Sequence, residues 1–291
     1  MTAGTAVLDS HVHFWDPTGT ISYPWLEDAP SLNVPFTPDD FAAVRPEDAS
    51  AVFVEAGCAQ EHAGAEVEWV RDQAVRHPWI VGAVAHVRLE DPESARTAID
   101  RYADDPFVVG VRRNVQDEPA GFLADAGLRA GVRLLGEAGL PFDACVREHQ
   151  LPELAELVAA CPRTTIVLDH LGKPKSAVEH SAWRGALRRL AEHDNVVVKL
   201  SGLGTELNAG TSRTGTIALL HEALDAFGAE RCLYGGDWPV MTLATTYEDW
   251  LAVVLEALAQ YSAATADAVL RANAQRVYRV RSTAPADTPS I

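Results

Sequence analysis

The sequence predicts an α/β protein with the fold of a (β/α)8 barrel. Its 291 residues are close to the roughly 250 that such a barrel typically needs. Short apolar runs alternate with stretches of helical periodicity, which is typical of parallel strands covered by helices on both faces. Eight strands can be counted in this way, and none is followed by a GxGxxG motif, so a barrel is favoured over a dinucleotide-binding sheet.

The elements follow one another in a regular order. The opening strand is the apolar run that ends in HVH at residues 11–13, and four prolines between Pro17 and Pro35 then predict an irregular loop over residues 14–40. Apolar runs, several of them rich in β-branched residues, mark seven more strands, at 51–56, 80–87, 107–111, 141–146, 164–169, 195–200 and 231–235. Helical spacing predicts helices at 63–77, 92–102, 122–138, 150–160, 182–193, 216–227, 247–259 and 265–278.

No linker divides the chain, so we expect one domain over residues 1–281 and a mobile tail at 282–291. The net charge of −17, from 24 basic and 41 acidic side chains, argues against nucleic acid and anionic membranes as partners. We expect no signal peptide and no membrane span, because no apolar run reaches about 18 residues. Four cysteines without CxxC spacing indicate reduced thiols in a cytoplasmic protein. The oligomeric state stays open, with a homo-oligomer among the options.

Polar residues collect at the carboxyl ends of the predicted strands, where (β/α) barrels carry their active sites. Side chains two residues apart in a strand share a face, so His11 and His13 can point at one spot. Each residue has a structural explanation as well: His170 could bond to backbone, and Asp237 could cap the next segment. The strand ends carry, in chain order, His11 and His13, Arg112 and Arg113, Arg147, Asp169 and His170, Lys199 and Ser201, and Asp237.

Four of these residues form a possible ligand set for a metal ion. His11, His13, His170 and Asp237 would offer nitrogen and oxygen donors that suit one divalent ion such as zinc. The same residues can also work without an ion, because Arg112 and a histidine could polarise a substrate carbonyl. The sequence therefore leaves the metal open.

Aromatic and basic residues are candidates for the pocket wall. Trp15 and Trp25 lie in the long loop and could either stack on the ring of a bound molecule or pack the loop. Arg113, Arg147 and Lys173 could contact a carboxylate or hydroxyl groups of a substrate. Cys145 has no activating neighbour in the sequence and is interpreted as a core residue.

Taken together, the segments HVHFWDP, GVRRNVQDEP, VLDHLGKP, VKLSGL and YGGDWPV resemble the amidohydrolase superfamily. The closer similarity is to its sugar lactonase branch, which includes L-fuconolactonases, L-rhamnonolactonases and pyrone-dicarboxylate lactonases. The resemblance covers nearly the whole chain and implies a distorted TIM barrel. It implies that Asp237 accepts a proton from the attacking water and that Arg112 holds substrate oxygens.

The sequence departs from the family pattern at three positions. The lysine that bridges two metals in binuclear relatives is not evident, since the fourth strand ends in Arg112 and Arg113, and this favours one ion over two. Arg113 stands where many lactonases have histidine, and His86 where tryptophan is common.

The leading hypothesis is a hydrolase that opens the ring of a sugar-acid lactone, with Asp237 as general base and His11, His13 and His170 around it. The first alternative is a metal-dependent, non-oxidative decarboxylase of the same superfamily. A binding protein that kept the barrel but lost catalysis is the third reading.

Overall fold

Eight parallel strands form one sheet in a computed structural model that describes residues 6–178 and 180–280. Each strand pairs with the next one along the chain, in the order β1 to β8, as a (β/α)8 barrel requires. The predicted fold is therefore confirmed. The strands are β1 Leu8–Val12, β2 Ser50–Val54, β3 Ile80–His86, β4 Val108–Asn114, β5 Phe142–Cys145, β6 Ile166–Leu168, β7 Val196–Leu200 and β8 Cys232–Tyr234.

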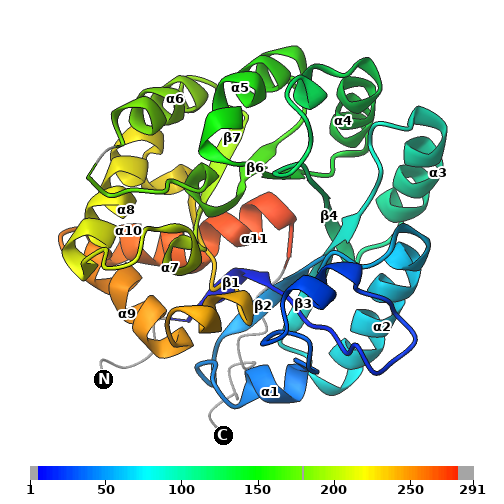
Figure 1. Cartoon of the computed structure of the whole chain (residues 1–291), viewed down its shortest axis with the longest axis horizontal. Coiled ribbons are helices and arrows are strands. Elements are labelled where there is room, and N and C mark those ends of the chain that lie inside the picture. The colour runs from blue at the N-terminus through cyan, green and yellow to red at the C-terminus, as the bar shows by residue number, and fades with distance from the viewer. Residues whose placement is uncertain (1–5, 179, 281–291) are drawn as a thin grey trace, which may run out of the picture.

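Helices surround the strands as an outer ring (Figure 1). The α-helices are α1 Pro38–Ala42, α2 Ala63–Arg76, α3 Pro92–Ala103, α4 Ala126–Ala138, α5 Leu151–Ala160, α6 Ser181–Ala191, α7 Leu203–Glu206, α8 Arg213–Phe227, α9 Tyr247–Leu258, α10 Ala263–Asp267 and α11 Asn273–Tyr278. Short 3-10 turns lie at Pro24–Asp28, Gln60–His62, Phe122–Ala124, Glu148–Gln150, Asp169–Gly172, Ala229–Arg231 and Val240–Leu243.

Two predicted helices are interrupted. The helix expected over 122–138 breaks at Asp125, whose carboxylate accepts a hydrogen bond from the backbone N–H of Leu128 and so starts α4 there. The helix expected over 265–278 contains a π-helical turn at Ala268–Ala272 between α10 and α11. The other predicted elements differ from the observed ones mainly by a few residues at their ends.

The first and last strands meet through irregular contacts instead of a long ladder. The backbone N–H of His13 donates to the carbonyl of Trp238 at 2.7 Å, and that of Asp237 donates to the carbonyl of His11 at 2.8 Å. The hydroxyl of Ser10 donates to the carbonyl of Tyr234 at 2.6 Å. Closing the barrel in this way places the ends of β1 and β8 side by side.

The barrel interior is apolar at one end and charged toward the other. Ala274 and Tyr278 of α11, which lies across the barrel in Figure 1, pack on valine and leucine side chains from the strands. In β7, Val197 belongs to this cluster, and Lys199, two residues on, shares its face. The strand side chains in the cluster are Leu8, Val52, Val54, Val84, Val109, Val167, Val197 and Leu233.

All four cysteines are buried free thiols, as predicted. Among the described residues, no helix has the length and apolar character needed to cross a bilayer. The expected tail at 282–291 lies outside the described residues, and a single domain over 1–281 stays a prediction.

Candidate active site

His11 and His13, at the end of β1, face each other across a gap of 3.1 Å between their Nε2 atoms. Pairing between β1 and β2 shifts its register between Asp9 and Val12, and this irregularity lies at the histidine pair. Their rings meet edge to face with centroids 4.8 Å apart. Two imidazole nitrogens this close need a proton or a cation between them, because two facing lone pairs repel each other.

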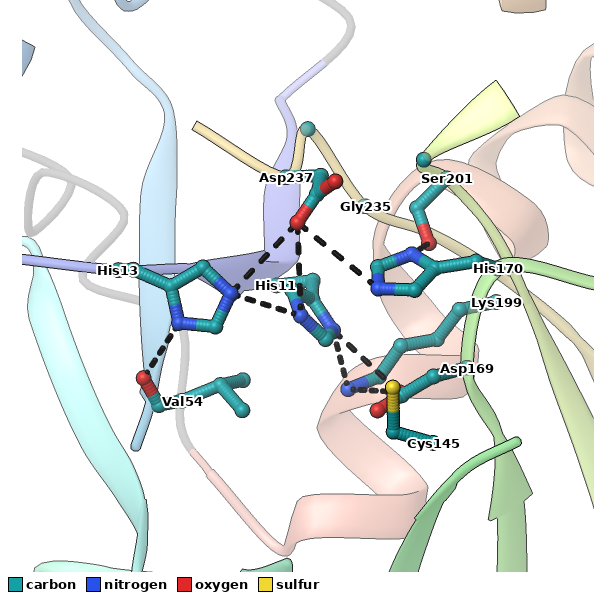
Figure 2. A network of polar contacts seen from close by, with 12 residues as sticks. His11, His13, Val54, Cys145, Asp169, His170, Lys199, Ser201, Gly235 and Asp237 are labelled. Carbon is teal, nitrogen blue, oxygen red and sulfur yellow. Dashed lines mark hydrogen bonds and ion pairs between the residues drawn. The ribbon is translucent and has the colours of Figure 1, made fainter. Parts of the chain in front are cut away.

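Asp237, from the loop after β8, brings its carboxylate to the same point (Figure 2). Its Oδ1 lies 3.7 Å from Nε2 of His11, 3.5 Å from Nε2 of His13 and 3.8 Å from Nε2 of His170. The predicted constellation therefore assembles from the ends of β1, β6 and β8. All four side chains are buried.

The outer nitrogens of the rings are held by fixed partners. His13 has its Nδ1 at 2.8 Å from the carbonyl oxygen of Val54, which can only accept, so this nitrogen carries a proton. Nδ1 of His170 lies 2.8 Å from the hydroxyl of Ser201. Nδ1 of His11 lies 3.0 Å from Nζ of Lys199 and 3.3 Å from Oδ1 of Asp169. These contacts fix which ring edge faces Asp237.

His170 lies in a left-handed turn that follows β6. His170, Leu171, Gly172 and Lys173 all have positive φ angles, of 54°, 55°, 70° and 55°. Such angles cost of order 1–3 kcal/mol for each residue other than glycine, so surrounding contacts must hold the turn. The Trp183 indole donates to the carbonyl of Leu171 at 2.7 Å. His170 and Lys173 both reach the cavity described below.

A charged cluster lies directly beneath His11 in the barrel interior. Lys199 is fully buried and contacts Asp143 Oδ2 at 2.5 Å and Asp169 Oδ1 at 3.1 Å. Burial alone would lower the pKa of Lys199, but these two carboxylates raise it above its usual value. The ammonium therefore stays charged and holds Asp169 in contact with His11.

Arg112, near the end of β4, is the second buried cation. Its Nε donates to Glu55 Oε1 at 2.6 Å and its Nη2 donates to the Glu55 carbonyl at 2.7 Å. Burial would raise the pKa of Glu55, but Arg112 outweighs it and the value falls to about 2. Nη1 of Arg112 lies 3.5 Å from Nε2 of His11, so the guanidinium borders the histidine cluster.

The imidazoles keep Asp237 ionised. Burial would raise its pKa, yet His170, His13 and His11 together hold the pKa well below the usual value of 3.8. Burial also lowers the pKa of His170 to about 4, despite the opposing charge of Asp237. At neutral pH the site thus presents a carboxylate beside a neutral His170.

A cavity of about 450 Å³ opens above this cluster, within the range of small-molecule sites. Its lining residues include seven of the candidates from the sequence, while His11 lies beneath it. Arg113 pairs instead with Glu90 at 2.9 Å and also with Glu118. Arg147 pairs with Asp117 at 2.8 Å at the rim. The candidates among the lining residues are His13, Trp15, Trp25, Arg112, His170, Lys173 and Asp237.

The two tryptophans form the aromatic side of this cavity. Trp15 is buried, and its indole N–H is shared between the carbonyls of Leu32 and Val34, both at 3.0 Å. The indole N–H of Trp25 donates to the carbonyl of Ala56 at 2.8 Å. Their rings meet edge to face with centroids 5.3 Å apart. Both tryptophans thus pack the loop and also line the cavity, and their stacking on a bound ring stays a prediction.

The donor set fits a metal ion. Donors around a tetrahedral zinc ion at about 2.0–2.1 Å lie roughly 3.3 Å from one another. The Nε2 atoms of His11 and His13 are 3.1 Å apart, and Asp237 Oδ1 lies 3.5 to 3.8 Å from the three ring nitrogens, which is close to that spacing. Within residues 6–178 and 180–280, two groups could hold an ion: His11, His13 and Asp237, and His11, Asp169 and His170.

Sequence reasoning placed Lys199 and Asp169 at strand ends but did not include them among the site residues. It also did not assign Asp143 or Glu55 to the site. The available signal was a charged residue inside an apolar strand run, as in VVVKL and PFDAC, because such a charge is buried only with a partner.

Histidines and an aspartate converge at the strand ends of this (β/α)8 barrel. This arrangement is typical of barrel enzymes that bind a metal ion or catalyse a hydrolysis at that end. Comparison with known proteins narrows the class. The amidohydrolase family model matches residues 8–280, and the chain therefore belongs to the amidohydrolase family.

Three relatives show how far the similarity extends. An L-fucono-1,5-lactonase of Burkholderia ambifaria is 31% identical over 281 residues, which cover 94% of this chain and 95% of that protein. An amidohydrolase of Burkholderia multivorans, solved with bound zinc, is 30% identical with a TM-score of 0.83 and covers 94% of this chain and 99% of its own. A 5-carboxyvanillate decarboxylase of Sphingomonas paucimobilis is 13% identical with a TM-score of 0.66, covers 96% of this chain and 100% of its own, and shares the fold alone.

Proposed function

We propose that this enzyme hydrolyses the ring ester of a sugar-acid lactone. The observation that carries the proposal is the convergence of Asp237 Oδ1 on three imidazole nitrogens at 3.5 to 3.8 Å, at the floor of the cavity. The lactonase named above, 31% identical over most of the chain, supports the choice of substrate class. The decarboxylase alternative has support from fold likeness alone, at 13% identity.

Asp237 is proposed as the general base. It is ionised at neutral pH, so it can accept a proton from a water molecule placed between the carboxylate and the substrate carbonyl. The water oxygen bonds to the carbonyl carbon, and the carbonyl electrons move onto oxygen. The ring C–O bond then breaks, and the proton held by Asp237 is available to the departing ring oxygen. One lactone and one water give one hydroxy acid.

Arg112 and the histidines are proposed to stabilise and orient this reaction. The guanidinium of Arg112 is fixed by Glu55 and lines the cavity, so it can hold the negative charge that develops on the carbonyl oxygen. His13 and His170 contact the carboxylate of Asp237 and hold its orientation. Arg113 pairs with Glu90 and Glu118 outside the cavity lining, whereas Arg147 pairs at the rim with Asp117, so of these two arginines only Arg147 is kept as a candidate for substrate binding.

His11, His13 and Asp237 would hold one divalent ion, with His170, 3.8 Å from Asp237 Oδ1, as the proposed fourth ligand, and zinc suits these ligands. When bound, such an ion supplies carbonyl polarisation and a lower pKa for the attacking water. Asp169 would then accept from Nδ1–H of His11 and fix the ring from behind, as outer partners commonly do in metal sites, while Lys199 holds Asp169 in place.

The test is hydrolysis of a panel of aldono-1,5-lactones by the wild type and by Asp237→Asn. The amide cannot accept a proton, so we expect kcat to fall at least about 10³-fold while the fold survives. Asp267→Asn, at a partly exposed position paired with Arg271, serves as a matched control with unchanged turnover. Wild-type protein without turnover on the panel would refute the function, and an active Asp237→Asn would refute the base.

A further inference from the structure

The cavity has two unlike walls. Trp15 and Trp25 form one, and a row of polar side chains from other loops forms the other. The mechanism above uses neither. The polar wall consists of Asn114, Gln116, Asp117, Lys173, Thr205 and Glu206.

Lys173 is the centre of this polar wall. Its Nζ donates to Gln116 Oε1 at 2.6 Å and to Glu206 Oε1 at 2.7 Å. The side chain is 11% exposed and that of Glu206 is 20% exposed, so both are largely withdrawn from bulk water yet reach the cavity. An ammonium group has three protons, and these two contacts use two of them. The third is available to a bound molecule.

The position of Lys173 is tied to the catalytic floor. It lies three residues after His170 in the left-handed turn, and its backbone N–H donates to the carbonyl of His170 at 2.8 Å. A ligand group held by Lys173 is therefore kept at a fixed offset from the side chain that contacts Asp237. This offset is a requirement for positioning a ring substrate, since small misplacements of the reacting atoms are costly.

Each cation around the cavity already has an anionic partner. Arg112 is matched by Glu55 at 2.6 Å, and Lys173 by Glu206 at 2.7 Å. Arg147 at the rim is matched by Asp117 at 2.8 Å and also lies 3.9 Å from Glu206 Oε2, so it keeps an anionic partner when Glu206 is replaced. A substrate carrying its own carboxylate would find an anion beside each of these cations.

We propose that Lys173, Gln116 and Glu206 form a subsite that binds ring hydroxyl groups of an uncharged polyhydroxy lactone, and that Glu206 disfavours lactones carrying a carboxylate. This inference rests on the proposed function. A hydroxyl can accept from the Lys173 ammonium and donate to the Glu206 carboxylate at once. A carboxylate can only accept, and at this position it would face the like charge of Glu206, which is a means of rejecting the wrong substrate.

The test compares two lactones of the same ring size, a neutral aldono-1,5-lactone and an aldarolactone that carries a free carboxylate. In Glu206→Gln, the Lys173 charge loses its anionic partner. We expect kcat/KM to fall about 10-fold on the neutral lactone and to rise about 10-fold on the charged one, so that the preference changes about 100-fold. The double variant Lys173→Met, Glu206→Gln should lose the gain on the charged lactone, because the unpaired ammonium that caused it is gone.

Glu118→Gln is the matched control, because Glu118 pairs with Arg113 outside the cavity lining, and it should leave the preference unchanged. A parallel fall on both lactones in Glu206→Gln, or an unchanged ratio, would overturn the subsite. Calorimetric Kd values for the corresponding unreactive lactams, neutral and carboxylated, give the same comparison without turnover. If neither lactone is hydrolysed but the lactam preference reverses in Glu206→Gln, the proposed function fails and the subsite stands.

Discussion

Replacing Gly202 by alanine should displace the His170 ring without substituting any side chain of the site. Gly202 follows Ser201 after β7, has a φ of +69°, and lies against the imidazole of His170. A Cβ added there would lie 2.4 Å from Nδ1 and 2.5 Å from Cγ of His170. The close approach of backbone and ring requires glycine at this position.

The size of the effect follows from these distances. Non-bonded heavy atoms prefer separations of about 3.5 Å or more, so the ring must move by roughly 1 Å. A misplacement of that size can cost about 10²-fold in rate. We expect kcat/KM for an aldono-1,5-lactone to fall about 100-fold. The positive φ adds a loss of about 1 kcal/mol in the free energy of unfolding, which lowers Tm by a few degrees.

Gly121→Ala separates the two effects. Gly121 also has a positive φ, +88°, but an added Cβ there meets nothing within 4 Å. This variant should show the same small drop in Tm and wild-type kinetics. The assay is steady-state hydrolysis with thermal unfolding of both variants. Wild-type kcat/KM in Gly202→Ala would show that the position of His170 does not matter for turnover, and the reasoning would fail.

Three further predictions concern charge and metal. The pKa of His170 is lowered to about 4 in the folded protein and is about 6.5 in the unfolded chain, so the unfolded chain binds more protons between these pH values. The free energy of unfolding should therefore fall by about 3 kcal/mol as the pH drops from 6.5 to 4. Urea titrations at both pH values measure this loss, which should be absent in His170→Asn. Arg112→Met leaves Glu55 buried without its arginine partner and should lower the free energy of unfolding by about 3–5 kcal/mol in the same measurement. Arg113→Met should retain kcat/KM within about 2-fold. Equal losses of kcat/KM in the two variants would contradict the assignment of Arg112 alone to the site. Zinc at about 100 times its Kd should add about 3 kcal/mol to the free energy of unfolding, and the same Tm shift in His13→Asn would exclude the proposed ligand set.

The sequence predicted the strands well because a parallel strand covered on both faces is apolar over several consecutive residues. Runs such as VVVKL and FVVGV are apolar and β-branched over a few residues, and no other element fits them as well. The same period of two predicted that His11 and His13 face one point, and their Nε2 atoms are 3.1 Å apart. Helix ends were less certain, since a single side chain such as that of Asp125 decides where α4 begins.

The left-handed turn after β6 could not be predicted. In the segment DHLGKP only Gly172 signals a positive φ, whereas His170, Leu171 and Lys173 adopt one against their local preference. Contacts from distant residues, among them Trp183 on the turn and Gly202 against the ring, hold it there. Arg112 and Arg113 posed a similar problem, because alternation separates them but only the register of neighbouring strands decides which one enters the site.

The sequence by itself determined the barrel, the order of its strands and the four residues proposed to act on the ester bond. The barrel and the strand order follow from local periodicity and from the rule that parallel strands end on one side, and the choice of the four residues also rests on the resemblance of their motifs to the amidohydrolase superfamily. Only the tertiary structure decided that Lys199 and Asp169 support His11, that Arg113 points away, and that Lys173 meets Glu206 across the cavity. Each of these depends on contacts between segments more than 20 residues apart, whose pairing is set by barrel closure and packing and leaves no trace in local sequence.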